Sequence, residues 1–229
     1  MRTIPGLVIF VLAAAAATAS AQSTGARAER DREFTEGAYL EPDLKRGAEL
    51  FETCAACHGK DGRGTEDGEI PAIAGQHGSV LLKQLTDFRH DQRWNERMQN
   101  FTDHHHLPDA QALTDVAAYV MYLPRFPPTI MGIGDGTALG EGASVYFQKC
   151  EQCHGPIGQG DLLKNRPRLA GQHYAYLLRQ LQETAAGQRP GMDAAHVARL
   201  KELTPVQMRG VADYLSRLSP DLSSKQRSR

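Results

Sequence analysis

The stretches that decide the fold are residues 54–58, which read CAACH, and residues 150–154, which read CEQCH. Both match C-x-x-C-H, the pattern that attaches a c-type haem to a protein. In this arrangement the two cysteines bind the vinyl groups of the haem, and the histidine places an imidazole nitrogen on the iron. The sequence therefore predicts two covalently attached c-type haems. Their expected attachment and iron-binding residues are Cys54, Cys57, His58, Cys150, Cys153 and His154.

The two motifs belong to an internal repeat with an offset of 96 residues. When residues 54–85 are placed over residues 150–181, fifteen of 32 positions are identical and no gap is needed. The block Ala-Gly-Gln-His, for example, occurs at 74–77 and again at 170–173. Such a repeat predicts two copies of one folding unit. The Pro- and Gly-rich stretch between the copies, residues 124–140, predicts a linker.

Apolar residues within each copy recur at the spacing of helices, and no stretch convincingly predicts a strand. Helices are expected over about 42–53 and 142–149, just before the motifs, and again at the end of each unit. Thr114 is the expected N-cap of the first closing helix, while Thr204 and Pro205 are expected to begin the second. The predicted fold is all-α, with two tandem helical domains, each wrapped around a haem that supplies the apolar volume such small units lack.

The first 21 residues have the character of a secretory signal peptide. Arg2 precedes an apolar run, and the small residues 19–21 provide a cleavage site. An uncleaved membrane anchor is the alternative, but Pro5 and Gly6 interrupt the run, which leaves it short for a spanning helix. The expected product is periplasmic, either soluble or peripherally bound to the membrane. The predicted divisions are a signal peptide 1–21, an N-terminal extension 22–40, a first domain 41–123, a linker 124–140, a second domain 141–218 and a basic tail 219–229.

The sixth iron ligands are sought among the six methionines. Met98 and Met192 lie 40 and 38 residues beyond the motif histidine of their own copy, and a repeated unit predicts such similar spacings. A thioether ligand raises the potential of a haem, which suits a carrier late in an electron-transport chain. Met208 falls on the apolar stripe of its helix, so packing explains it better than ligation. The rival ligands are His196, close to Met192, and the run His104, His105 and His106, which is expected to be a solvated loop.

The chain resembles the cytochrome c4 family of dihaem, two-domain cytochromes c over about residues 40–218. The resemblance rests on the doubled motif, the doubled Pro-x-x-Ala-Gly-Gln, the secretion signal and the closing helices with Tyr119 and Tyr214. It implies two tandem cytochrome c-like domains with His/Met ligation in each, and electron relay in the periplasm. It also implies that the backbone carbonyls of Pro71 and Pro167 accept a hydrogen bond from the motif histidines. The extension 22–40 is outside the family pattern.

The resemblance implies an electron carrier rather than an enzyme, with a quinol-oxidising complex and a terminal oxidase as the expected partners and no nucleic acid. One alternative is the haem subunit of an enzyme complex, such as a flavin-containing sulfide dehydrogenase. Another is a catalytic dihaem enzyme, which would need an open coordination site. A zinc site made of the four thiolates would leave both motif histidines unexplained. A thioredoxin-like redox pair would need a βαβ setting.

The net charge of -1 conceals a difference between the two halves of the chain. Residues 22–124 contain 11 Lys/Arg against 18 Asp/Glu, a net charge of -7, whereas residues 125–229 contain 14 against 9, a net charge of +5. Such a dipolar molecule is expected to orient charged partners, with an acidic partner meeting the second domain. If other factors are equal, the negative field also gives the first haem the lower potential.

Overall fold

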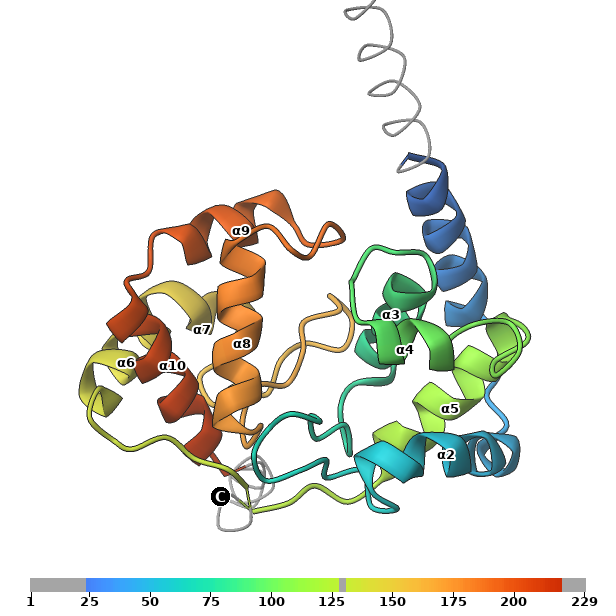
Figure 1. Cartoon of the computed structure of the whole chain (residues 1–229), viewed down its shortest axis with the longest axis horizontal. Helices are drawn as coiled ribbons and strands as arrows, with labels where there is room; N and C mark the ends of the chain where they lie inside the picture. Colours follow the sequence, from blue (N-terminus) through green and yellow to red (C-terminus); the bar gives the residue numbers. More distant parts are fainter. Residues whose placement is uncertain (1–23, 128–130, 220–229) are drawn as a thin grey trace, which may run out of the picture.

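The structure is a computed structural model that describes residues 24–127 and 131–219. The predicted signal peptide, residues 128–130 of the predicted linker and residues 220–229 of the predicted tail lie outside the described residues. Two helical lobes lie side by side, and the N-terminal helix packs on the first (Figure 1). In the part of the chain that is described, no helix combines the length and the apolar character that crossing a membrane requires.

The first domain is built on four helices that follow the N-terminal helix. Asp43 caps the first of them by accepting hydrogen bonds from the next turn, and Gly59 ends it with a φ of 79°. The helix predicted for residues 42–53 therefore extends through the whole motif, which forms its last turns. The bounds are α2 Leu44–His58, α3 Gly78–Arg89, α4 Glu96–Phe101 and α5 Ala110–Tyr122.

The second domain repeats this plan with one local difference. Its motif helix runs through three adjoining segments, and the middle one is a π-helical turn, a form that occurs mostly as single turns within α-helices. The strand-like pairing among the described residues is an isolated bridge between Asp161 and Arg166, so the predicted all-α fold is confirmed. The bounds are α6 Leu139–Val145, η2 Tyr146–Cys150, α7 Glu151–His154, α8 Tyr174–Ala185, α9 Ala194–Lys201 and α10 Pro205–Arg217.

Each domain has its own apolar core, formed where the motif helix crosses the closing helix. Glycines allow the close approach: a Cβ added to Gly47 would lie 2.2 Å from the carbonyl oxygen of Asp115, and one added to Gly142 would lie 1.9 Å from the carbonyl carbon of Gly210. The first core contains Phe51, Leu81, Leu82, Leu107, Leu113, Val116 and Val120. The second contains Val145, Tyr146, Leu177, Leu200, Met208, Val211 and Leu215, which confirms the packing role expected of Met208.

The closing helices begin differently from one another. Thr204 caps α10 through a capping box with Gln207, as expected. The prediction for Thr114 is wrong, because Asp109 caps α5 one turn earlier and accepts a hydrogen bond from Ala112 N at 2.7 Å. Thr114 instead lies inside the helix, where its buried hydroxyl contacts the backbone of the N-terminal helix at Gly37.

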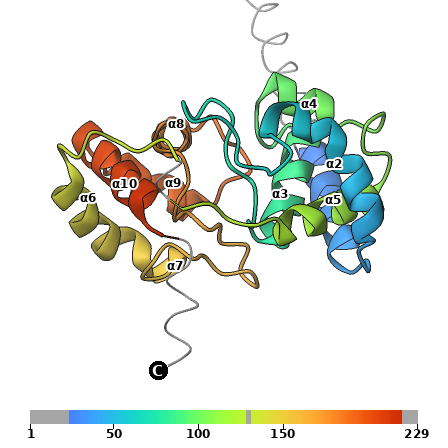
Figure 2. The same cartoon turned by 90° about the horizontal axis from the view of Figure 1, so that it is seen from below.

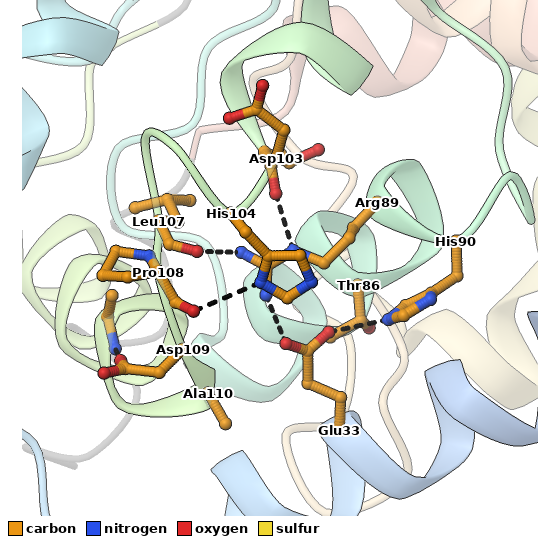
Figure 3. Close-up of polar contacts among 12 residues, drawn as sticks. Glu33, Thr86, Arg89, His90, Asp103, His104, Leu107, Pro108, Asp109 and Ala110 are labelled. Atoms are coloured by element: carbon orange, nitrogen blue, oxygen red, sulfur yellow. Dashed lines mark hydrogen bonds and ion pairs between the residues drawn. The ribbon is translucent and has the colours of Figure 1, made fainter.

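The N-terminal helix, residues 24–38, is fixed to α3 by a polar cluster (Figure 3). Arg89 donates a hydrogen bond to the Glu33 carboxylate, and His90 Nε2 lies 2.8 Å from the other carboxylate oxygen. Burial by itself would raise the pKa of Glu33, but these two partners outweigh burial and hold that pKa below its ordinary value of 4.5. The helix thus adds a negatively charged, nearly buried contact to the first domain.

Two glutamines join the domains through a local two-fold pattern. Gln76 donates to the carbonyl of Arg168 at 2.9 Å and accepts from Arg168 N at 2.8 Å. Gln172 makes the same pair of bonds to Ala72, at 2.7 and 3.0 Å. Gln76 and Gln172 are related by the 96-residue offset, and so are Ala72 and Arg168. The same side chain of each copy therefore binds the backbone of the other.

The repeated histidines lie at this interface and take part in the same pattern. His77 Nε2 lies 2.9 Å from the carbonyl oxygen of Gln159, and His173 Nε2 lies 2.7 Å from that of Arg63. His173 Nδ1 accepts a hydrogen bond from Gly132 N, so its hydrogen must be on Nε2 and the ring is neutral. Both repeated histidines therefore form hydrogen bonds between the domains.

Candidate haem sites

The first motif forms the C-terminal end of α2. Cys54 packs against the first core, Cys57 is exposed, and neither is in a disulfide. His58 Nδ1 lies 3.0 Å from the carbonyl oxygen of Pro71. A carbonyl can only accept, so Nδ1 carries the hydrogen and Nε2 keeps a free lone pair for a metal. Burial lowers the pKa of His58, which keeps the ring neutral as ligation requires.

The second motif repeats this geometry. His154 Nδ1 lies 3.3 Å from the carbonyl oxygen of Pro167, so both proline carbonyls lie where the resemblance to the cytochrome c4 family implies. Burial, followed by the charges of His196 and Arg166, lowers the pKa of His154 to about 4, although the bond to Pro167 opposes the shift. Burial also raises the pKa of the Cys150 thiol to about 11. Both side chains are therefore neutral near pH 7.

The backbone after each motif folds back under the histidine. Gly59 and Gly155 have φ values of 79° and 78°, which suit glycine. Gly64 N then donates to the carbonyl of His58, and Gly160 N donates to that of His154, each at 2.8 Å. Each domain therefore offers two thiols, one turn apart on a helix, beside an imidazole with a free Nε2. This donor set fits a covalently attached haem in each domain.

The alternative uses of the four cysteines do not fit the structure. The pairs lie in different domains, and the described residues contain no group of three or more His, Cys, Asp or Glu side chains placed to hold a metal ion. A zinc site of four thiolates therefore does not form there. The βαβ setting of a thioredoxin-like pair is also missing from the described part of the chain.

The two predicted methionine ligands occupy different places in their domains. Met98 is half-buried and is the third residue of α4, where its backbone N–H donates to the cap residue Asn95 at 3.0 Å. Met192 is also half-buried, but it precedes Asp193, the cap of α9. Met98 and Met192 have similar spacings from their motif histidines, but they lie at different positions relative to the short helix of their domain.

The rival histidines separate into two kinds. His104 and His105 are exposed, and His104 Nδ1 lies 3.2 Å from the carbonyl oxygen of Pro108 (Figure 3). His106 is half-buried and places Nδ1 2.8 Å from the carboxylate of Asp103. These contacts agree with the expected surface loop. His196 differs, because the centroid of its ring lies 6.1 Å from that of the His154 ring.

Sequence analysis missed an arginine pair that links the domains. Arg93 donates to Tyr176 Oη at 2.8 Å and to Gln180 Oε1 at 2.7 Å, while Arg189 donates to Gln84 Oε1 at 3.0 Å. Arg93 and Arg189 have the same 96-residue offset as the repeat, and so do Gln84 and Gln180. Extending the comparison of the two copies beyond residue 85 would have found this pair.

Comparison with known proteins agrees with this geometry. Residues 44–124 and 139–219 each match the cytochrome c domain family. The fold, the two motifs and these matches define a c-type cytochrome with two haem-binding domains.

The chain belongs to the cytochrome c4 family of dihaem electron-transfer cytochromes. It is 34% identical over 184 residues to cytochrome c4 of Thiocapsa roseopersicina, covering 72% of this chain and 87% of that relative. It is 35% identical over 180 residues to a thiosulfate dehydrogenase electron acceptor of Stutzerimonas stutzeri, covering 71% and 77%. The structure of reduced cytochrome c4 from Pseudomonas stutzeri superposes with a TM-score of 0.69 at 27% identity and covers 78% of this chain and 100% of its own. These relatives agree with the expected role as an electron carrier rather than an enzyme.

Proposed function

We propose that this dihaem cytochrome works in the periplasm, with one haem in a domain of residues 41–123 and one in a domain of residues 141–218. The first haem is held by Cys54, Cys57, His58 and Met98. The second is held by Cys150, Cys153 and His154, with Met192 or His196 as its sixth ligand. Each bound haem supplies a one-electron ferric/ferrous couple.

The observation that carries this proposal is the repeated motif histidine, buried and bound to a proline carbonyl in both domains. The carbonyls of Pro71 and Pro167 fix the rings of His58 and His154 and make them better donors to a metal. The paired glutamine contacts hold the domains in one orientation, so the two haem sites keep a constant separation. Such a separation supports passage of an electron within one molecule.

Haem content and ligation test this proposal together. We expect the purified protein to keep two haems per chain after denaturation in acid and organic solvent, because thioether bonds survive such treatment. Replacing both cysteines of either motif with serine should remove one haem. Release of a haem from the unfolded wild-type protein would contradict the proposal.

We further propose a membrane-bound quinol-oxidising complex as the electron donor and a terminal oxidase as the acceptor. The difference in charge between the two halves supports orientation of these partners. Rates of reduction and oxidation should fall as salt rises above about 0.1 M, where the Debye length is roughly 10 Å. Rates that do not depend on salt would contradict electrostatic steering.

A second candidate function is acceptance of electrons from a thiosulfate-oxidising enzyme. It is favoured by the 35% identity to a thiosulfate dehydrogenase electron acceptor. Mixing the oxidised protein with a thiosulfate dehydrogenase and thiosulfate, and separately with a quinol-oxidising complex and quinol, distinguishes the two candidates. The physiological donor should reduce it at a rate that exceeds the other by orders of magnitude.

A further inference from the structure

The short helices α4 and α9 hold corresponding positions, since each follows the long middle helix of its domain. Asn95 caps α4 and accepts a hydrogen bond from Met98 N at 3.0 Å. Asp193 caps α9 and accepts one from His196 N, also at 3.0 Å. Met98 and His196 are therefore the third residue of equivalent helices. By this structural register, the counterpart of Met98 in the second domain is His196.

The position of the His196 ring agrees with this register. Its centroid lies 6.1 Å from the centroid of the His154 ring, and the two planes are inclined by 53°. Metal–imidazole bonds of about 2.0–2.1 Å, with each ring centre about 1.1 Å beyond its nitrogen, would separate the centroids of two opposed imidazoles by about 6 Å. The inclination does not matter, because each imidazole can rotate about its bond to the metal. This spacing would therefore allow His154 and His196 to hold one iron together.

The segment that carries Met192 is bound to the first domain. Gly191 N donates to the carbonyl of Gln92 at 2.9 Å. Arg27 of the N-terminal helix donates to the carbonyl of Pro190 at 3.0 Å. The backbone just before Met192 thus forms part of the domain interface, whereas His196 lies within α9 beside the motif histidine. Met192 therefore does not hold the position in the second domain that Met98 holds in the first.

We propose that His196, and not Met192, is the sixth ligand of the second haem. The second haem is then bis-histidine ligated, and the first is ligated by His58 and Met98. This inference rests on the proposed attachment of a haem at Cys150, Cys153 and His154. Methionine ligation raises the potential of a haem compared with two histidines. At equilibrium, the first electron taken up by the protein therefore rests on the first haem.

The test is to count methionine-ligated haems in the oxidised holoprotein, using the thioether-to-iron charge-transfer band and near-infrared magnetic circular dichroism. We expect one methionine-ligated and one bis-histidine haem in the wild type. Met192→Leu should leave both signals unchanged. His196→Met should double the methionine signal and remove the bis-histidine signal, and Met98→Ala should abolish the methionine signal.

Two methionine-ligated haems in the wild type, or loss of one methionine signal in Met192→Leu, would overturn the assignment of His196. Both results would leave the dihaem proposal intact if the haem content is two per chain. A haem content below two would instead contradict the dihaem proposal, and the assignment of His196 with it. The wild-type spectrum is decisive even if His196→Met does not fold.

Discussion

Each domain has a short helix after its long middle helix, α4 in the first domain and α9 in the second. The third residue of α4 is Met98, whereas the third residue of α9 is His196. The motif histidines, by contrast, make the same bond to a proline carbonyl in both domains. The motif at the end of its helix, the glycines after it and the proline belong to one continuous stretch of chain, so a change in any of them disturbs the others. The third residue of α4 or α9 lies on a separate short helix. It can therefore differ between copies while the rest of the site is kept.

The domains also differ in what surrounds them. The N-terminal helix packs on the first domain through Glu33 and Thr114, and the acidic half of the sequence lies on the same side of the linker. The glutamine and histidine contacts between the domains, however, follow the repeat, and Figure 2 shows α3 and α8 on the facing sides of the two lobes. The molecule therefore combines a symmetric interface with two unlike haem surroundings.

The largest expected effect comes from removing one haem at a time. Cys54→Ser with Cys57→Ser should leave a single haem with the spectrum of bis-histidine ligation. Cys150→Ser with Cys153→Ser should leave a single haem with the methionine charge-transfer band. Mass spectrometry under denaturing conditions gives the haem count, and identical spectra for the two double variants would remove the proposed difference between the domains.

The next effect tests whether the helix crossings of the two domains are equally tight. Gly142→Ala places a methyl group against the backbone of Gly210, and overpacking of this kind typically costs about 1–3 kcal/mol. Gly47→Ala should cost a similar amount in the first domain, where the backbone of Asp115 is in the way. Chemical denaturation, followed through the absorption of each haem, measures both.

Gly140→Ala is the matched control for this experiment. Apart from its chain neighbours and the backbone of its own helix, nothing lies within 4 Å of a Cβ added to Gly140, so the alanine should not lower stability. A loss of stability for Gly140→Ala equal to that for Gly142→Ala would show that close packing is not the cause.

The symmetry of the interface is tested by Gln76→Ala and Gln172→Ala. Each variant removes two hydrogen bonds to the backbone of the other domain, and unsatisfied groups of this kind cost about 1–3 kcal/mol each when buried. We expect the two variants to loosen the domains equally, as measured by small-angle X-ray scattering. Gln148→Ala, which removes a bond to Ser144 within one helix, should change nothing. Unequal effects of Gln76→Ala and Gln172→Ala would show that the two glutamines do not contribute equally to holding the domains together.

The sequence predicts well the features that the two domains share, and it predicts poorly the features that differ between them. The motifs, the helices and the buried Met208 depend on local pattern, so they could be predicted from spacing. The proline contacts were implied by the resemblance to the cytochrome c4 family. The cap of α5 was misplaced because Thr114 and Asp109 are both good cap residues and only tertiary packing decides between them. Spacing pairs Met98 with Met192, whereas the caps Asn95 and Asp193 pair Met98 with His196, because counting residues does not locate the start of α9. The cap hydrogen bonds give that register.

The smallest expected effect concerns the N-terminal helix. The pKa of Glu33 is lowered in the folded protein, so its carboxylate stabilises the fold above its ordinary value of 4.5, and this contribution is lost as pH falls through the lowered value. The protection factors of residues 24–38 against hydrogen exchange should therefore fall as pH drops below about 4.5. Glu33→Gln should remove most of this pH dependence, while the exposed Glu29→Gln should keep it. An unchanged profile in Glu33→Gln would exclude Glu33 as the responsible group.

Two influences on the haem potentials act in opposite directions. Surface charge alone favours the lower potential for the first haem, because residues 22–124 carry a net charge of -7. Axial ligands shift haem potentials over a range of about 0.8 V, while surface charges are screened beyond about 10 Å at 0.1 M salt. We therefore expect the ligands to decide the order.

A potentiometric titration of the wild-type protein, with each haem followed by its own spectrum, tests most directly whether the axial ligands decide the order of the two potentials. The single-haem cysteine variants provide the reference spectra that assign each step to a domain. We expect two separate midpoints, with the methionine-ligated first haem reduced at the higher potential and the second haem at the lower. Equal midpoints, or a higher midpoint for the second haem, would contradict the difference between the two domains.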